Sequence, residues 1–439
     1  MKRKAHGAQK PRHINRIVEV ASTAQRSDSP ARAINQRFLN KRLLFWTMLF
    51  QFLFAWFVFQ STAGQSVFVQ LNSMVSGIVD AALAGPKFVF GPLADPAASD
   101  KIGLGFILFF QGLATIFVFS ALLAILYHIG LMSRLLKIFA RIFSSLTRIS
   151  GAESLSAAAN IFVGNESLLT IRPCLPKLTR SEYCTLLTTC MATISANVIG
   201  VYVGALRAEL PSIAGHLVSA SILSVPAAVL LAKLAMPEKE TPETLGVNIT
   251  PHFDRDPSLV EAILNSGETG FRMVVGITSM LIAVVGLLAI INALSGWGGG
   301  HINQWLGWSF GWSIEGFLGL IYYPFVWLMG VPANDVPAVA SLLGTRMIAT
   351  EVPAYFSLSE MMKSGAIEPR SAVIAAYTLC GFAHLPSLAI YVGGATALAP
   401  NRKSDIASVA WIALFVATLA CLMTGAFAGL FYSGNSLIY

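Results

Sequence analysis

The chain has 439 residues, of which 55% are apolar and 12% charged, and its mean hydropathy is +0.66. Because soluble domains carry about 25% charged residues, this composition excludes an ordinary soluble domain and indicates an integral membrane protein. The net charge of +8 arises in residues 1–42, where eleven Lys and Arg accompany Glu19 and Asp28. We predict that residues 1–42 form a basic, disordered cytoplasmic tail, with a nucleic-acid-binding arm as the less favoured alternative.

A helix needs about 20 mostly apolar residues to cross about 30 Å of hydrocarbon. Two apolar stretches, 151–173 and 331–355, are interrupted by Gly, Pro and charged residues. Broken segments are tolerated at membrane depth only where protein or a cavity surrounds them, so we predict two re-entrant hairpins. The sequence thus predicts an all-α membrane protein with these two hairpins and about seven transmembrane helices. The seven spans are 43–60, 104–128, 182–205, 214–236, 272–296, 372–396 and 406–433.

Positive charge is distributed unevenly between the connections of these spans. Four connections carry most of the Lys and Arg and are assigned to the inner side: 129–150, 172–181, 237–271 and 397–405. The segments 61–103 and 297–330, taken as outer loops, carry only Lys87 and Lys101. By the positive-inside rule we predict a cytoplasmic N-terminus and an external C-terminus. Segment 131–146 spaces its cations at helical intervals and is predicted to lie along the inner membrane surface.

The chain repeats one plan in two halves. The first broken segment carries Glu166 and precedes a helix with a polar midpoint at 192–197. The second carries Glu351 and precedes a helix whose midpoint, 380–387, contains Gly and Pro residues that can unwind it. The assignment of the loops makes the two broken segments enter the membrane from opposite sides. Interrupted segments at matching places of inverted halves indicate a secondary-transporter site near the middle of the membrane.

The two carboxylates are the leading candidates for binding residues. A charged side chain at the centre of a bilayer costs roughly 2.5–3.5 kcal/mol on insertion scales, so intramembrane carboxylates usually have a function. A flat, partly apolar solute would also need a wall, for which Phe382 and Val198 are suited. The alternative is structural: Glu351 would pair with Arg346, and Glu166 with a neighbouring Arg or with helix N-termini.

Four stretches carry a resemblance to a known family. They are 151–182 with "NIFVGNESLLTIRP", 191–205 with "MATISANVIGVYVGA", 330–355 with "GTRMIATEVPAY", and 369–405 with "CGFAHLPS". In this order they resemble the two hairpins and the following helices of the concentrative nucleoside transporters, from about residue 40 to the C-terminus. The resemblance implies a homotrimer in which a scaffold holds a mobile transport domain, an elevator-type mechanism.

The resemblance also implies roles for individual residues. Glu166, with Asn165 beside it, would bind the edge of the nucleobase. Glu351 would accept hydrogen bonds from ribose hydroxyls. The other residues implied in substrate binding are Val198, Phe382, His384 and Ser387. A sodium ion would be bound by oxygen atoms of Asn160, Val163, Thr193 and Ile194, a donor type that suits a hard cation.

The sequence departs from the family pattern at both ends of the expected site. Gly164-Asn165-Glu166 is one residue shorter than the usual G-Q-T/S-E. In the second half, His384 replaces an Asn that faces ribose in relatives, and Pro386 removes a backbone N–H. The imidazole is bulkier than an amide and titrates near physiological pH when unperturbed. We therefore expect altered sugar selectivity, with deoxy or modified sugars better tolerated, and a pH-dependent affinity.

These observations predict a secondary active transporter that imports nucleosides with Na⁺ through the inner membrane. The alternatives are a proton-coupled transporter of a nucleobase or modified nucleoside, and a nucleoside-binding gate or sensor. An enzyme is not expected, because no second His accompanies His384 and no HExxH or GxSxG motif occurs. The expected partners are the solute, the lipid bilayer and two further copies, but no nucleic acid. The expected parts are a basic tail at 1–42, scaffold helices at 43–128, a first transport repeat at 129–236, a cytoplasmic loop, scaffold helix and outer segment at 237–330, and a second transport repeat at 331–439.

Overall fold

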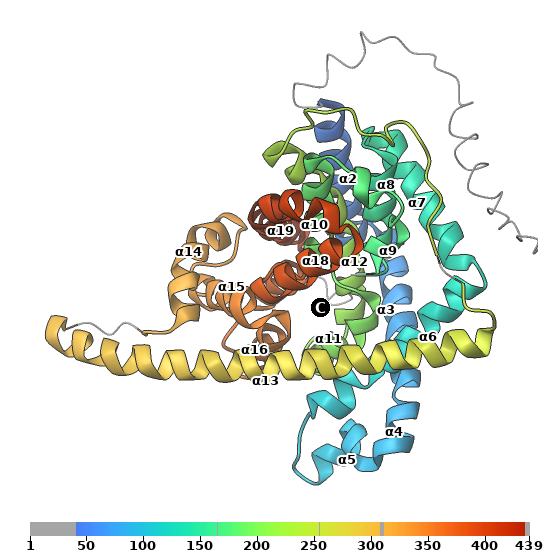
Figure 1. Cartoon of the computed structure of the whole chain (residues 1–439). Helices are drawn as coiled ribbons and strands as arrows, with labels where there is room; N and C mark the ends of the chain where they lie inside the picture. The colour runs from blue at the N-terminus through green and yellow to red at the C-terminus, as the bar shows by residue number, and fades with distance from the viewer. Residues whose placement is uncertain (1–40, 165, 254, 308–310, 435–439) are drawn as a thin grey trace, which may run out of the picture. The chain divides into compact units, whose positions relative to one another are not determined.

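A computed structural model of the chain describes residues 41–434 apart from 165, 254 and 308–310. In this part of the chain every regular element is a helix (Figure 1). Seven helical stretches are long and apolar enough to cross a membrane. Of the basic tail, only Lys41 and Arg42 belong to the described residues.

The seven candidate spans differ in membership from the seven predicted ones. Segment 372–396 is broken into two shorter helices, and 62–101 stands in its place. The prediction of loops at 61–103 and 297–330 was wrong, since both segments are largely helical. The helices there are α3 (Thr62–Ala82), α4 (Ala84–Phe90), α5 (Pro96–Lys101), the end of α13 (Leu259–Leu306) and α14 (Ile314–Leu328).

Polar residues made α3 look like a loop, but they have specific partners. Asn72 donates through Nδ2 to the Pro211 carbonyl at 3.2 Å and accepts from the Gly215 N–H at 3.0 Å. Phe68 of the same helix is buried against Gly215, where a side chain would not fit. The stretch that contains α3 is apolar enough to span a membrane, and the fold supplies partners for the polar side chain of Asn72 within it.

The two halves repeat one order of elements: a helix, a second helix, a hairpin, a broken helix and a long helix. In the first half these are α6 (Thr115–His128), α7 (Leu131–Thr147), α8 (Gly151–Ala159) with α9 (Ser167–Thr170), α10 (Arg180–Ala192) with α11 (Ile199–Leu206), and α12 (Ile213–Ala235). In the second half they are α13, α14, α15 (Val336–Ala349) with α16 (Glu351–Lys363), α17 (Pro369–Leu379) with α18 (Leu385–Leu398), and α19 (Lys403–Phe431). We call α8 with α9 hairpin 1, and α15 with α16 hairpin 2. The second leg of hairpin 2 extends beyond the predicted end at 355.

The sequence explains where hairpin 1 and the broken helix after it begin. Ser150 and Glu153 form a capping box at the start of α8, and Thr179 and Glu182 form another at the start of α10. In each box the hydroxyl and the carboxylate satisfy backbone N–H groups that the helix leaves unpaired. The Ser150 hydroxyl also donates to Glu182 at 2.6 Å, and Lys233 of α12 lies 2.6 Å from the Glu153 carboxylate. Three helix ends are therefore joined at the base of hairpin 1.

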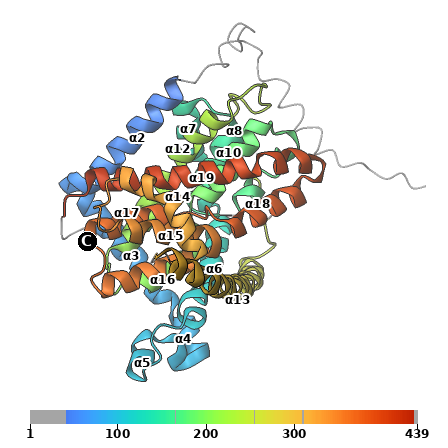
Figure 2. The same cartoon turned by 90° about the vertical axis from the view of Figure 1, so that its left-hand side faces the viewer.

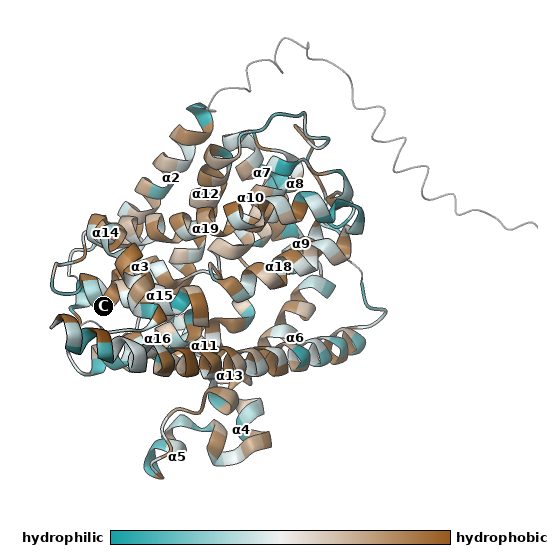
Figure 3. Cartoon of the chain, turned by 60° about the vertical axis from the view of Figure 1, so that its left-hand side comes forward, coloured by the Kyte–Doolittle hydropathy of each residue, from teal (hydrophilic) through white to brown (hydrophobic). Residues whose placement is uncertain are grey.

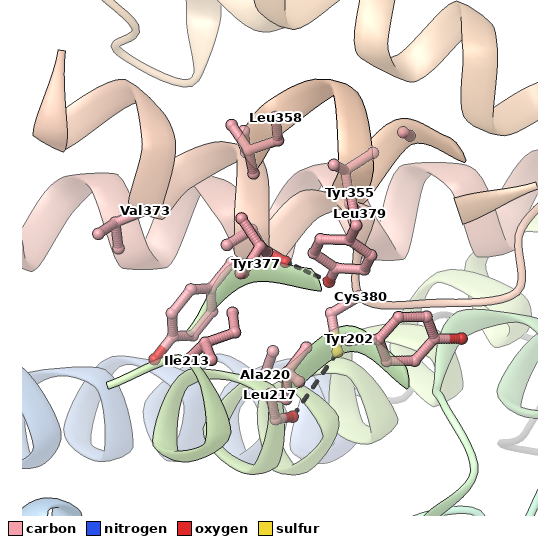
Figure 4. Packing of buried hydrophobic residues seen from close by; sticks show 14 of the residues in the cluster. Tyr202, Ile213, Leu217, Ala220, Tyr355, Leu358, Val373, Tyr377, Leu379 and Cys380 are labelled. Carbon is pink, nitrogen blue, oxygen red and sulfur yellow. Dashed lines mark hydrogen bonds between the residues drawn. The ribbon is translucent and has the colours of Figure 1, made fainter. Parts of the chain in front are cut away.

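Helices from the two halves interlock. Figure 2 shows α19 crossing the molecule, and it packs against α10 and α12 of the first half and α17 of its own. Nearby, Tyr202 and Leu217 of the first half face Tyr355 and Cys380 of the second (Figure 4). The Cys380 thiol donates to the Leu217 carbonyl at 3.6 Å. The buried core is thus shared between the repeats, and this packing holds their helix breaks together.

The helix α13 is far longer than the span predicted at 272–296. It has 48 residues, which corresponds to about 72 Å at 1.5 Å per residue. It packs against α6, while apolar residues cover much of its remaining surface (Figure 3). Trp297 and Trp305 are 75% and 84% exposed. In a membrane protein such a face is covered by lipid or by another protein surface.

Candidate functional site

Both helices that follow the hairpins are broken at the predicted polar midpoints, and the two breaks touch each other. The first lies between α10 and α11, at Thr193 to Ser195, and the second between α17 and α18, at Cys380 to His384. The Phe382 N–H donates to the Thr193 carbonyl at 3.3 Å. A Cβ at position 381 would lie 2.8 Å from the Ala192 carbonyl oxygen, so the close approach of the two breaks requires glycine there.

The tip of hairpin 1 lies against both breaks. The Phe162 carbonyl accepts from the Ala196 N–H at 3.1 Å. A Cβ on Gly164 would meet Ser195 at 3.0 Å and the Phe382 ring at 3.6 Å. Residue 165, the Asn expected to bind substrate, lies outside the described residues. The tip, the first break and the half-buried Phe382 therefore form one neighbourhood in the middle of the fold.

Glu166 precedes α9 and is half-buried. The Asn197 amide donates to its carboxylate over 3.4 Å, which is long for a hydrogen bond to a charged acceptor. The side-chain oxygen of Asn197, Oδ1, is buried without a hydrogen-bond partner among the described residues. Val198, the next residue, is buried beside this pair. A carboxylate held this loosely keeps most of its accepting capacity for a ligand.

Glu351 is the first residue of α16, directly after the tip of hairpin 2. The tip is marked by Thr350, whose φ of +95° is unusual for a residue with a branched side chain. One carboxylate oxygen of Glu351 accepts from the Tyr202 hydroxyl at 2.6 Å, and the other lies 2.8 Å from Nε2 of His384. The suggested pairing with Arg346 is not formed, because that guanidinium donates to the Thr378 carbonyl at 2.6 Å.

His384 has a defined orientation. It is the N-cap residue of α18, and its Nδ1 accepts from the Ser387 N–H at 3.2 Å. A ring nitrogen that accepts carries no proton, so the proton of the neutral ring is on Nε2, the nitrogen that lies nearest to Glu351. The Ser387 hydroxyl lies 3.0 Å from the same Nε2. The structure thus brings three predicted residues together: His384 and Ser387 are hydrogen-bonded to each other, and the Glu351 carboxylate contacts the His384 ring.

The four residues expected to bind sodium lie on the two segments that meet at hairpin 1. All four are buried. The side-chain amide of Asn160 donates to the hydroxyl of Thr189, one turn before Thr193, at 3.2 Å. Its side-chain oxygen, Oδ1, is buried without a hydrogen-bond partner among the described residues. Among the described residues, the backbone carbonyls of Val163 and Ile194 accept no backbone hydrogen bond. The Thr193 hydroxyl donates to the Thr189 carbonyl and can still accept. Oxygen atoms left without donors fit a small hard cation.

Tyr202, which donates to Glu351, was not predicted from the sequence as a site residue. Tyr202 lies one helical turn after Val198 and therefore faces the same side of α11. That spacing was the available signal. It is weak, because an aromatic residue in an apolar helix is usually part of the core.

Comparison with known families identifies the class of protein. The description "Na+ dependent nucleoside transporter C-terminus" matches residues 216–429, and the corresponding N-terminal description matches residues 33–93. A "Nucleoside recognition" domain, Gate, matches residues 109–209. The protein is therefore a transporter and not an enzyme.

Two similar proteins are also named as transporters. The uncharacterized transporter YutK of Bacillus subtilis is 33% identical over 87% of this chain and 90% of its own length. Sodium/nucleoside cotransporter 1 of Oryctolagus cuniculus is 32% identical to this chain. The alignment covers 89% of this chain and 59% of the longer relative. The chain belongs to the concentrative nucleoside transporter family.

A solved structure of similar fold covers almost the whole chain. CNTnw in an inward-facing, substrate-bound state superposes with a TM-score of 0.82 at 29% identity, over 96% of this chain and 97% of the other. The all-helical architecture with two hairpins, predicted from the broken apolar segments, is thus that of a nucleoside transporter.

Proposed function

We propose that this protein imports nucleosides together with Na⁺ by an elevator movement in the cytoplasmic membrane. The observation that carries the proposal is the convergence of two carboxylates from inverted halves on one pair of helix breaks. Glu166 lies on hairpin 1 and Glu351 on hairpin 2, with Phe382 between the segments that bear them. Broken helices at the meeting of inverted repeats are where secondary transporters bind solute and ion.

In this proposal the solute is recognised at two ends. Glu166, helped by Asn165 and Asn197, accepts hydrogen bonds from the nucleobase edge. Glu351 accepts from the sugar hydroxyls, with Ser387 beside it. Phe382 and Val198 supply an apolar wall for the base. Such a combination of an aromatic wall and a few fixed polar groups is typical of small-molecule sites.

The coupling ion in this proposal is one Na⁺, carried as a substrate between Asn160, Val163, Thr193 and Ile194. A charge that crosses 100 mV releases about 2.3 kcal/mol, and a tenfold ion gradient adds about 1.4 kcal/mol. Together these energies concentrate the solute a few hundredfold. A single ion is therefore sufficient for active uptake.

Two contacts support a cytoplasmic N-terminus and an external C-terminus. Arg42, at the start of α2 (Lys41–Gln60), donates to the Ser145 carbonyl at the end of the basic helix α7. Gln60, at the other end of α2, donates to the Phe431 carbonyl at the end of α19. The start of α2 thus lies on the side rich in Lys and Arg, and its end lies beside the C-terminal end of the chain.

In the proposed homotrimer, α13 and α14 face the neighbouring copies. Both helices present large apolar side chains, for example Leu264 at 68% exposure and Leu328 at 71%. The scaffold comprises the helices within 43–128 and α13. The two hairpins and the helices that follow them form the transport domain.

The proposed function is tested by uptake of labelled nucleosides into cells that express the protein, with Na⁺ replaced by choline. We expect uptake to require Na⁺ and to be selective within a nucleoside panel. Uptake that ignores Na⁺ but stops with a protonophore would replace Na⁺ by protons. Specific binding without uptake into cells or proteoliposomes would instead indicate a gate or sensor.

Replacing His384 by Asn tests the sugar end of the site. An amide adds both a donor and an acceptor there, so we expect the variant to favour ribonucleosides over deoxyribonucleosides more strongly than the wild type does. The Asn variant lacks the imidazole, so a pH dependence of affinity that comes from residue 384 should be absent from it. The measurement is the affinity of both proteins for ribo- and deoxyribonucleosides from pH 5.5 to 8. Identical selectivity and identical pH profiles would make His384 a packing residue.

A further inference from the structure

Tyr202 joins the two halves of the protein at the candidate site. It lies on α11 of the first half, is 1% exposed, and donates its hydroxyl to Glu351 of the second half at 2.6 Å. Its ring packs on that of Tyr355, with ring centroids 5.0 Å apart. Figure 4 shows the Tyr202 ring beside Cys380, with its hydroxyl directed away from the Leu217 side of the cluster.

The two donor groups beside Glu351 lie at different oxygens of its carboxylate. Tyr202 donates to Oε1, and Nε2 of His384 lies against Oε2. A carboxylate oxygen accepts about two hydrogen bonds, so each oxygen retains room for one more donor. The bond from Tyr202 and the contact with the His384 ring together restrict the rotation of the carboxylate. A carboxylate in this state can accept two donors side by side, one on each oxygen, as it does from a bidentate partner.

We propose that Tyr202 is a positioning residue that makes Glu351 selective for two hydroxyl groups on neighbouring carbons. This inference rests on the proposed function and specifies its solute: a nucleoside with an intact ribose diol is bound better than its 2′-deoxy or 3′-deoxy form. Without the Tyr202 hydroxyl, Oε1 loses its anchor and the carboxylate rotates freely enough to accept a single hydroxyl nearly as well as a pair. His384 alone holds only the other oxygen.

The chain offers a matched control for this role. Tyr355 is as buried as Tyr202 and is the ring against which it packs, but its hydroxyl donates to the Ala376 carbonyl at 2.8 Å. Exchange of either tyrosine for Phe removes one buried hydroxyl and one hydrogen bond. Only the exchange at Tyr202 removes a bond to Glu351, so a difference between the two variants reports on the carboxylate and not on packing.

The test uses the full-length protein, purified and reconstituted, and a ribonucleoside with its 2′-deoxy and 3′-deoxy forms as probes. Binding affinity and uptake are measured for wild type, Tyr202→Phe and Tyr355→Phe. We expect the preference for the ribo form to fall about tenfold in Tyr202→Phe, which corresponds to about 1.4 kcal/mol. Tyr355→Phe should keep the wild-type preference.

A second pair of variants covers the case in which Tyr202→Phe does not fold. Tyr202→Gln and Tyr202→Leu are similar in size, and only Gln retains an N–H donor that can reach toward Glu351. We expect Gln to retain more of the ribo preference than Leu. If Tyr202→Phe and Tyr355→Phe show the same ribo preference, and Gln and Leu at position 202 do as well, while the wild type binds nucleosides normally, the proposed role of Tyr202 is overturned and the proposed function is not. Absence of any nucleoside binding by the wild type would overturn the proposed function and this inference with it.

Discussion

Replacing Glu351 by Gln is expected to abolish nucleoside uptake while the protein still reaches the membrane. Both neighbours of this side chain carry donor groups: Tyr202 donates its hydroxyl to one oxygen, and Nε2 of His384 lies 2.8 Å from the other. A Gln side chain would turn its NH₂ group toward one of these donors. It would also lose the charge that strengthens hydrogen bonds from the solute, which contribute roughly 1.5–3 kcal/mol, or about ten- to a hundredfold in affinity.

The same result is expected for Glu166→Gln, because among the described residues its carboxylate accepts one long hydrogen bond, from Asn197. Uptake at low solute concentration and surface expression are measured for both variants. Glu360, an exposed carboxylate on the same helix as Glu351, provides the control Glu360→Gln, which should behave as wild type. Near-normal uptake by either site variant would remove that residue from the binding site.

Replacing Thr193 by Val is expected to raise the Na⁺ concentration for half-maximal uptake about tenfold. The exchange keeps the shape of the side chain and removes one oxygen that we assign to the ion. Loss of one good ligand from a small set corresponds to the lower end of roughly 1.5–3 kcal/mol, the range of a hydrogen bond to a charged group, or about tenfold in affinity. The measurement is uptake as a function of Na⁺ at fixed solute concentration.

Thr185→Val is a close control for this experiment. Thr185 lies on the same helix, is equally buried, and donates its hydroxyl to the carbonyl four residues earlier, as Thr193 does. It is more than two turns from the proposed ion site. If both variants shift the Na⁺ dependence alike, the effect comes from α10 as a whole. If neither shifts it, the hydroxyl of Thr193 is not an ion ligand.

The sequence by itself determined the class of the protein and the neighbourhood of its site. Composition required a membrane protein, and charges within apolar, Gly- and Pro-rich segments required hairpins, because a lipid bilayer offers no partner to free backbone groups. The break near Gly381 followed from local residue type, whereas at Thr193 the sequence indicated only a polar midpoint. These features are local, and local features are readable from a window of sequence.

Segment boundaries depended on the tertiary structure where polar residues found distant partners. The amide of Asn72 made α3 look like a loop, although Gly215 and Pro211 satisfy it. The length of α13 was underestimated, because the hydropathy window detected only its most apolar middle part. A hydropathy scale assigns one value to each side chain, whatever hydrogen-bond partner the folded chain provides for it.

Only the tertiary structure decided how the second carboxylate is held. Glu351 was expected to accept from sugar hydroxyls, or else to pair with Arg346, five residues away. In the fold, Arg346 turns to the Thr378 carbonyl, and Glu351 bonds to Tyr202, which is 149 residues distant in the chain. His384, expected at the sugar, places Nε2 2.8 Å from the Glu351 carboxylate, while the Ser387 N–H donates to its Nδ1. The direction of a side chain depends on donors and acceptors brought from other elements, and these are fixed only when the two halves pack together.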